Sequence, residues 1–102
     1  MKEIKAIIQP FMLDEVLRGL HEIDDLPAAT VSDVRGFSVV HPDYEPQTKI
    51  KLEMMVPREM VDAIVTAIEK HAHTGNPGDG RIFVISVEDT VKIRTGERDT
   101  AQ

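Results

Sequence analysis

The chain has 102 residues, the length of one domain with a single hydrophobic core. Its 18 acidic residues outnumber 12 basic ones, and the net charge of −6 argues against a nucleic-acid-binding protein, which needs a basic surface. The sequence contains no cysteine, which excludes disulfides, thiolate metal sites and a cysteine nucleophile. No stretch is long and apolar enough to cross a membrane, and no signal peptide is evident, so we expect a cytoplasmic protein without direct membrane insertion.

The first half of the chain predicts a strand, a helix and a second strand. Apolar residues alternate over residues 4–8, which predicts a strand that Pro10 ends. Apolar residues then recur at helical spacing over residues 13–23. Residues 30–40 are rich in β-branched side chains and predict a strand, with a bulge or bend near Gly36, where the alternation slips.

The second half repeats the pattern. Residues 41–47 are polar and hold two prolines, which predicts a loop, and a clearly alternating strand follows over residues 49–56. A second helix begins after Pro57, and Gly75 is the predicted C-cap at its end. Residues 81–87 predict a fourth strand.

This order predicts an α+β, ferredoxin-like split βαβ sandwich, with two helices on one face of a four-stranded antiparallel sheet and a C-terminal tail strand. The strand over residues 81–87 is apolar on both sides, so the face without helices needs a partner surface. Homo-oligomerisation is the simplest way to provide one. The alternative is that the tail folds back over this face.

The most distinctive segment is Thr-Gly-Asn-Pro-Gly-Asp-Gly-Arg, residues 74–81. Its glycines allow backbone amides to converge on an anion, and Arg81 is placed to pair with a phosphate. A helix C-cap followed by a tight turn is the alternative; it explains Gly75 fully, but Gly78 and Gly80 less well. The order helix, loop, strand also differs from the Walker A motif, in which the loop follows a strand and opens a helix.

Other charged residues carry weaker signals. Lys92 and Arg94 are two apart on a predicted extended segment, so their side chains would share a face about 6.5–7 Å apart and could straddle neighbouring phosphates. A solvated strand edge is the alternative for this pair. His71 and His73 diverge by about 200° on a helix and cannot easily share a metal. Nothing in these patterns requires an enzyme.

Taken together, four segments resemble the nitrogen-regulatory PII signal-transduction proteins: residues 1–16, 30–37, 74–84 and 93–97. The resemblance covers nearly the whole chain, as one PII-like domain over residues 1–102. It implies a homotrimer that binds ATP or ADP in clefts between subunits, with magnesium as a possible companion.

The resemblance also implies which residues bind the nucleotide. In the B-loop, residues 74–81, the phosphates would contact Gly78, Asp79, Gly80 and Arg81. From the neighbouring subunit's C-loop, residues 92–98, Lys92 and Arg94 would reach the same phosphates. The other implied nucleotide-binding residues are Ile7, Ala28, Ala29, Thr30, Gly36, Phe37, Ser38, Lys49, Glu53 and Met55. The family's usual lysine is Arg81 here and its first tail arginine is Lys92, which keeps the charges but changes the donor geometry.

The sequence departs from the family pattern between the second and third strands. The long T-loop is reduced to about residues 41–48, and Tyr44 lacks the motif that surrounds a modified tyrosine. Val40 stands where a glutamine helps bind magnesium and 2-oxoglutarate, although Lys49 matches the lysine that contacts 2-oxoglutarate. We therefore do not expect 2-oxoglutarate sensing. The short loop is similar to that of PII-like proteins associated with metal efflux or inorganic-carbon transport.

The leading hypothesis is a non-catalytic sensor of adenine nucleotides that regulates a membrane transporter or an enzyme through its loops. One rival is a trimer resembling the metal-binding CutA proteins, using His41, His71 or His73, but that family lacks the Gly-Asp-Gly loop and the Thr-Gly-Glu tail. Another is a slow ATPase, for which the sequence offers no candidate base.

Overall fold

The computed structural model describes residues 1–37 and 46–100. In chain order the elements are β1 (Lys2–Ile8), the 3-10 helix η1 (Pro10–Met12), α1 (Leu13–Leu20), β2 (Ala29–Gly36), β3 (Gln47–Val56), the 3-10 helix η2 (Arg58–Met60), α2 (Val61–Ala72), β4 (Gly80–Ser86), β5 (Asp89–Val91) and β6 (Arg98–Thr100). Four strands form an antiparallel sheet in the order β2-β3-β1-β4. The predicted ferredoxin-like α+β fold is confirmed.

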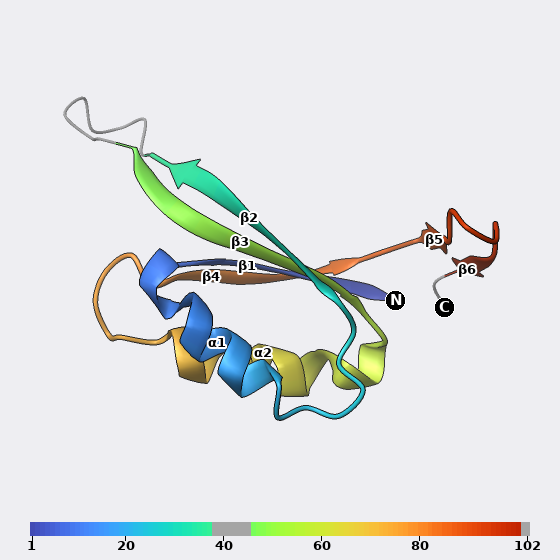
Figure 1. Ribbon diagram of the computed structural model, residues 1–102, viewed down its shortest axis with the longest axis horizontal. Helices are drawn as coiled ribbons and strands as arrows, with labels where there is room; N and C mark the ends of the chain where they lie inside the picture. The colour runs from blue at the N-terminus through green and yellow to red at the C-terminus, as the bar shows by residue number, and fades with distance from the viewer. Residues whose placement is uncertain (38–45, 101–102) are drawn as a thin grey trace.

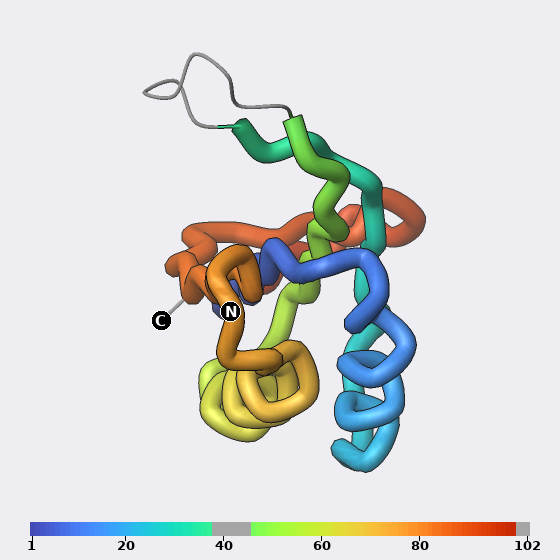
Figure 2. Tube along the Cα trace, turned by 90° about the vertical axis from the view of Figure 1, so that its left-hand side faces the viewer, coloured from blue at the N-terminus to red at the C-terminus, as the bar shows by residue number. Residues whose placement is uncertain are grey.

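Both helices cover the same face of the sheet (Figures 1 and 2). Side chains alternate between the two faces along the central strands β1 and β3, so every second residue points to the helices. The side chains that fill this layer are almost completely buried: Ile4, Ala6 and Ile8 of β1, Ile50, Leu52, Met54 and Val56 of β3, Val16 and Leu20 of α1, and Ile64, Ile68 and Ala72 of α2. No helix in the described part of the chain is long and apolar enough to cross a membrane.

The two helices pack closely because α1 presents a glycine to α2. A Cβ on Gly19 would lie 2.1 Å from Cδ2 of His71, so the imidazole ring occupies the space that any larger residue would take. His71 is half-buried at this contact. His71 is thus a packing residue. The sequence analysis treated it only as a possible metal ligand.

Two local predictions are wrong. The ladder between β2 and β3 runs without a bulge from the pair Ala29 and Met54 to the pair Gly36 and Gln47, and β2 ends at Gly36. Helix α2 ends at Ala72 because His73 is already extended, so Gly75 lies beyond the cap position. Residues 38–40 of the predicted second strand and 41–45 of the predicted loop lie outside the described residues.

The tail forms a hairpin instead of one extended strand. Strands β5 and β6 pair with each other, and the chain turns between them: the N–H of Gly96 donates to the carbonyl of Lys92 at 2.7 Å, and the N–H of Lys92 donates to that of Glu97 at 2.9 Å. The hairpin projects away from the sheet (Figure 1), so the alternative in which the tail covers the open face is wrong. The side chains of Met55, Phe83 and Ile85 on that face remain about 40% exposed.

Candidate functional site

One carboxylate organises the glycine-rich loop between α2 and β4. Asp79 accepts hydrogen bonds from the backbone N–H groups of Thr74, at 2.8 Å, and Gly75, at 2.9 Å, and from the Thr74 hydroxyl. These bonds, the one from the Thr74 hydroxyl foremost, lower the pKa of Asp79 below its usual value, because they stabilise the charged carboxylate. The Asp79 side chain therefore joins the two ends of the loop.

Two positions of the loop favour glycine, for different reasons. Gly80 has a φ of +110°, and a Cβ there would lie 1.8 Å from the carbonyl oxygen of Ile7. Gly78 has a φ of +93°, and its Cβ would lie 3.1 Å from Nε2 of Gln9. Close approach to the β1 backbone thus explains Gly80, and the positive φ explains Gly78.

Lys49 connects this loop to β3. Its side chain is only 9% exposed, and its ammonium group donates to the carbonyl of Gly78 at 2.9 Å and to Oε1 of Gln9 at 3.1 Å. An ammonium group has three N–H donors, and no third partner is found within the described residues. Lys49 therefore holds the loop to β3 with two of its N–H donors, and the third is available to a ligand within this part of the chain.

Arg81 lies on the open face of the sheet beside the same loop. It pairs with Ile7 across the β1–β4 ladder, and its side chain is exposed. Within residues 1–37 and 46–100 it forms no hydrogen bond or ion pair. We call the group of Ile7, Lys49, Gly78, Gly80 and Arg81 the cationic end of the open face. It combines two cationic side chains with two glycines, residue types from which polyanion sites are built.

A cavity of about 410 Å³ opens at the other end of this face. Its walls come from β1, β2, β3 and the segment before β2, and we call it the acidic cavity. It is lined by Glu3, Pro27, Ala28, Thr30, Glu53, Met54 and Met55. Lys51 lies 3.6 Å from the Glu53 carboxylate at its edge.

The strand register separates these two groups. Along β1, Ile7 pairs with Arg81 at the cationic end, whereas Glu3 pairs with Met55 at the acidic cavity. Four residues of strand span about 13 Å. One chain therefore carries two incomplete groups of the predicted nucleotide-binding residues, at opposite ends of one face.

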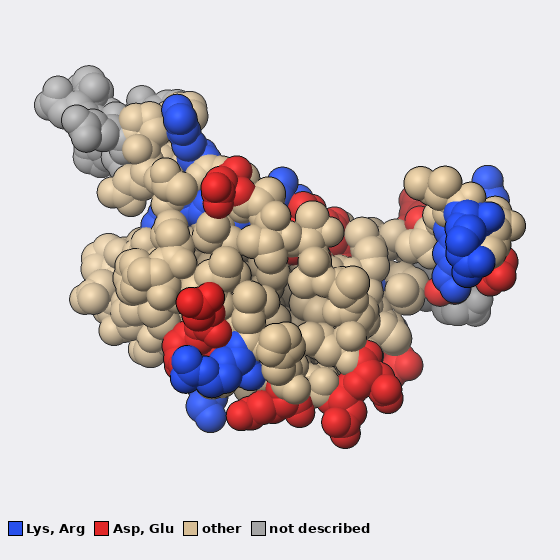
Figure 3. Space-filling model, viewed as in Figure 1, with Lys and Arg blue, Asp and Glu red and all other residues tan. Residues whose placement is uncertain are grey.

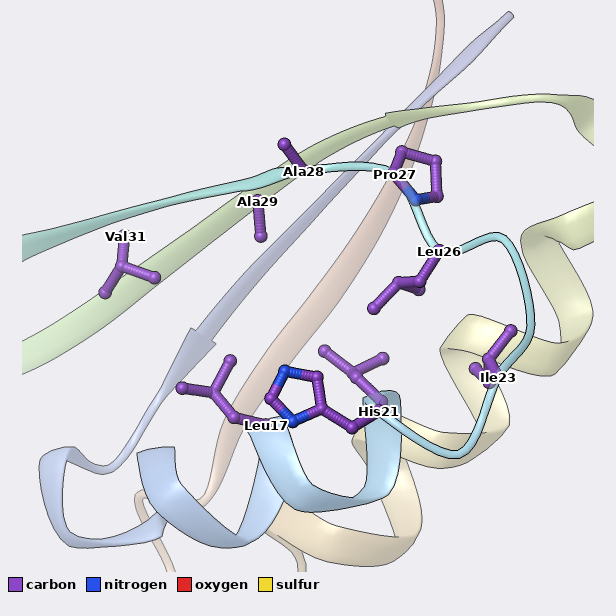
Figure 4. Close-up of a pocket in the computed structure, with 9 residues that line it drawn as sticks. Leu17, His21, Ile23, Leu26, Pro27, Ala28, Ala29 and Val31 are labelled. Atoms are coloured by element: carbon purple, nitrogen blue, oxygen red, sulfur yellow. The ribbon is translucent and has the colours of Figure 1, made fainter.

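Some predicted residues lie with neither group. Ala29 points to the helix side, opposite to Ala28, into an apolar cavity of about 490 Å³ between α1 and β2 (Figure 4). That cavity is lined by Leu17, Leu20, His21, Ile23, Leu26, Pro27, Ala28, Ala29 and Val31, none of which is a lysine or arginine that could bind a phosphate. Phe37 is 64% exposed just beyond β2, next to Gly36, whose Cβ would lie 3.9 Å from Cγ of Lys49. Ser38 lies outside the described residues.

Lys92 and Arg94 lie in the turn of the C-terminal hairpin, not on an extended strand, so the prediction that their side chains share one strand face is wrong. Figure 3 shows basic side chains gathered on this hairpin, away from the sheet. The hairpin follows the Ser86 end of β4, whereas Arg81 lies near the start of that strand, so the hairpin projects from the other end of the sheet (Figure 1).

Sequence reasoning missed Gln9, Thr74 and Glu3. Thr74 had a local signal, because a threonine and an aspartate that flank a glycine-rich turn often hydrogen-bond to its backbone. Gln9 and Glu3 had none, since their partners lie 40 and 50 residues away and only strand pairing brings them close.

The histidines do not form a metal site within the described residues. Within residues 1–37 and 46–100, no three histidine, aspartate or glutamate side chains lie close enough to hold a metal ion. His73 lies 3.9 Å from the carboxylate of Asp79, and His71 packs against Gly19. His41 lies outside the described residues.

The fold and the site define a ferredoxin-like domain with a polyanion-compatible loop at one end of an open sheet face. Comparison with known proteins identifies the group: the model of the family described as "Nitrogen regulatory protein P-II" matches residues 1–97. The chain belongs to the nitrogen regulatory protein P-II family. P-II proteins are regulatory signalling proteins, not enzymes.

Relatives match over almost their whole length. The chain is 42% identical to nitrogen regulatory protein P-II of Azospirillum brasilense, covering 96% of each chain. It is 41% identical to nitrogen regulatory protein P-II 1 of Escherichia coli K12, covering 99% of this chain and 98% of that protein. The crystal structure of Arabidopsis thaliana PII bound to citrate superposes with a TM-score of 0.81 at 37% identity, covering 96% of this chain and 84% of that one.

These relatives bear on the predicted shortening of the T-loop and on the predicted link to metal efflux. The alignments extend over 112 and 113 positions, more than the 102 residues of this chain, so the relatives contain residues that this chain lacks. The predicted association with metal efflux has no support, since the relatives are nitrogen regulatory proteins. The family assignment also removes the ground for the CutA-like alternative.

Proposed function

We propose that this protein is a cytoplasmic sensor of ATP and ADP that binds the nucleotide between the subunits of a homotrimer and regulates a transporter or an enzyme through its loops. The separation of the two groups of site residues carries this proposal. The cationic end and the acidic cavity lie about 13 Å apart on the face that the helices leave uncovered, so a second chain packed on that face could place its own residues against either group.

The chemistry of the cationic end fits a polyphosphate. Arg81 is an exposed guanidinium without a partner in the described part of the chain, and the buried ammonium of Lys49 keeps one free donor. Glycines at positions 78 and 80 allow the loop backbone to approach a bulky anion closely. The similar Arabidopsis protein was solved with citrate, another polyanion, which supports a site of this kind.

Two surfaces favour assembly of several chains. The exposed apolar side chains of Met55, Phe83 and Ile85 give the open face a reason to pack against a copy of itself. The hairpin carries Lys92 and Arg94 away from its own sheet, where a neighbouring chain's phosphate site could receive them. We assign no magnesium ligand, because the described residues form no cluster suited to a metal.

Signalling requires that the nucleotide bind one conformation of the loops more tightly than another, since a ligand with equal affinity for both shifts nothing. The partner would then recognise the favoured conformation. The family's role in regulation supports this part of the proposal.

Isothermal titration calorimetry with ATP, ADP and AMP tests the proposal, together with light scattering to measure the mass of the assembly. Arg81→Ala should weaken ATP binding by about ten- to a hundredfold, the contribution of a charge-assisted hydrogen bond. Arg58→Ala is the matched control, since Arg58 is an exposed arginine in η2, remote from the open face. Absence of binding at millimolar ATP, a monomeric protein, or equal effects of the two substitutions would refute the proposal.

A further inference from the structure

Two nitrogen atoms lie beside the position that Gly78, which has no side chain, leaves open in the B-loop. A Cβ at Gly78 would lie 3.1 Å from Nε2 of Gln9 and 3.5 Å from Nζ of Lys49. Gln9 directly follows β1, where it is the N-cap of η1, and Lys49 belongs to β3. Donor groups from two parts of the chain therefore converge on one side of the loop.

The hydrogen bond between these two side chains fixes how the Gln9 amide is turned. An ammonium group can only donate, so it must meet the amide through the oxygen, and Oε1 of Gln9 accepts from Nζ of Lys49 at 3.1 Å. The amide nitrogen, with its two N–H donors, is then the atom next to Gly78. Within residues 1–37 and 46–100 these N–H groups have no acceptor. They are available to a ligand at the loop.

The charge of Lys49 indicates which kind of ligand belongs there. Its side chain is only 9% exposed, yet no carboxylate of the described residues forms an ion pair with it. Buried charges are normally paired, because removing an ion from water is costly. The Gly78 carbonyl and the Gln9 amide accept two of its hydrogen bonds but bring no negative charge. An anion beside Gly78 would supply that charge and meet the Gln9 N–H groups at the same time.

We infer that Gln9 is a further residue of the phosphate site, with two roles. Its amide oxygen positions the Lys49 ammonium, and its amide N–H groups donate to a phosphate oxygen of the ligand beside Gly78. This inference rests on the proposed nucleotide function and adds a neutral donor to the two cations of the cationic end. A neutral amide suits this place, because an acidic side chain would neutralise Lys49 and repel the polyphosphate.

Two substitutions separate a role in ligand binding from a purely structural one. Gln9→Glu keeps an oxygen that accepts from Lys49 and gives the buried cation a counter-charge, so this variant should be at least as stable as the wild type. It loses the N–H donors, however, and adds a negative charge beside the ligand. Gln9→Met has a similar length but lacks both acceptor and donors, so Lys49 loses a partner and stability should fall. The more stable variant should therefore bind the nucleotide more weakly.

The experiment is ATP titration by calorimetry together with thermal unfolding at one fixed protomer concentration, for the wild type, both Gln9 variants and the control Gln47→Glu. Gln47 is exposed and lies two residues before Lys49 on β3, so the control adds the same charge at this end of the sheet without replacing a contact of Lys49. Gln9→Met should bind ATP about tenfold more weakly than the wild type, the effect of one hydrogen bond to a charged group. Gln9→Glu should bind about a hundredfold more weakly, because repulsion adds to that loss, and Gln47→Glu should stay within about threefold.

Two results overturn the inference while the proposed function stands: Gln9→Glu binds ATP as tightly as Gln47→Glu, or the affinities of the two Gln9 variants follow their stabilities. If the wild-type protein binds no ATP, the proposed function fails and this inference fails with it. NMR gives a direct readout, since the side-chain amide signals of Gln9 can be identified by their absence from Gln9→Met. These signals should shift when ATP is added, and signals that do not move at saturating ATP also overturn the inference.

Discussion

Replacing Gly80 with alanine tests whether the site depends on the close approach between the B-loop and β1. The added Cβ would lie 1.8 Å from the carbonyl oxygen of Ile7 and 3.3 Å from Cα of Ile8, both backbone atoms of a central strand. Neither atom can move without disturbing the ladders on both sides of β1. The φ of +110° is also unfavourable for any residue with a Cβ.

The loss of stability expected for Gly80→Ala has two parts. A non-glycine residue in a sparsely populated backbone conformation costs about 1–3 kcal/mol. Relieving the clash requires that β4 separate from β1 at its first pair, which adds about 1–3 kcal/mol, similar to the cost of overpacking a rigid core. We therefore expect Gly80→Ala to lower the free energy of unfolding by about 2–6 kcal/mol in total.

Gly96→Ala is the matched control for this experiment. Gly96 also has a positive φ, +73°, but nothing lies within 4 Å of its Cβ position. Only the conformational cost remains, about 1–2 kcal/mol at most. Urea denaturation at one fixed protomer concentration measures both variants. Equal losses of stability would refute the argument that backbone contact with β1 fixes Gly80.

Two further predictions concern stability. Hydrogen bonds, the one from the Thr74 hydroxyl foremost, lower the pKa of Asp79 below 3.8. The ionised Asp79 therefore stabilises the fold above pH 3.8, and this stabilisation is lost as the pH falls through the pKa of Asp79 in the folded protein. Asp79→Asn should therefore have a lower free energy of unfolding than the wild type at neutral pH, as measured by urea denaturation. A difference between the two free energies that does not narrow below about pH 3.8 contradicts this. Gly19→Ala should destabilise the protein by about 1–3 kcal/mol because of the clash with His71, yet stabilise the His71→Ala variant by about 1 kcal/mol through helix propensity. The same sign in both backgrounds, measured by thermal unfolding, would show that the ring is not the obstacle.

The fold was predictable because its signals are local. Alternation in Ile4, Ala6 and Ile8 and the helical spacing of Ile64 and Ile68 each place one apolar face, and those faces became the core. Burying them in one layer leaves few arrangements of two βαβ units, and right-handed crossovers select among these. The wrong predictions near Gly36 and Gly75 fall at element ends, whereas those for the tail concern how a whole segment folds.

The candidate site was predictable in part. The density of glycines before Arg81 indicated an anion-binding loop, and the structure shows that one of them, Gly80, allows contact with the backbone of β1. Asp79 is predicted to contact phosphates, and the structure adds that its side chain holds the loop together. Sequence alone could not distinguish these roles, because the partner of a carboxylate depends on the path of the folded loop.

By itself, the sequence determined the order of the elements, the apolar stripes that form the core and the glycine-rich loop, because each of these depends on neighbours within a few residues. Only the tertiary structure decided that Lys49 holds that loop, that Glu3 and Glu53 line one cavity, and that the tail turns into a hairpin away from the sheet. These features depend on strand register, which brings together residues far apart along the chain. Register also sets the cationic end and the acidic cavity at opposite ends of one face.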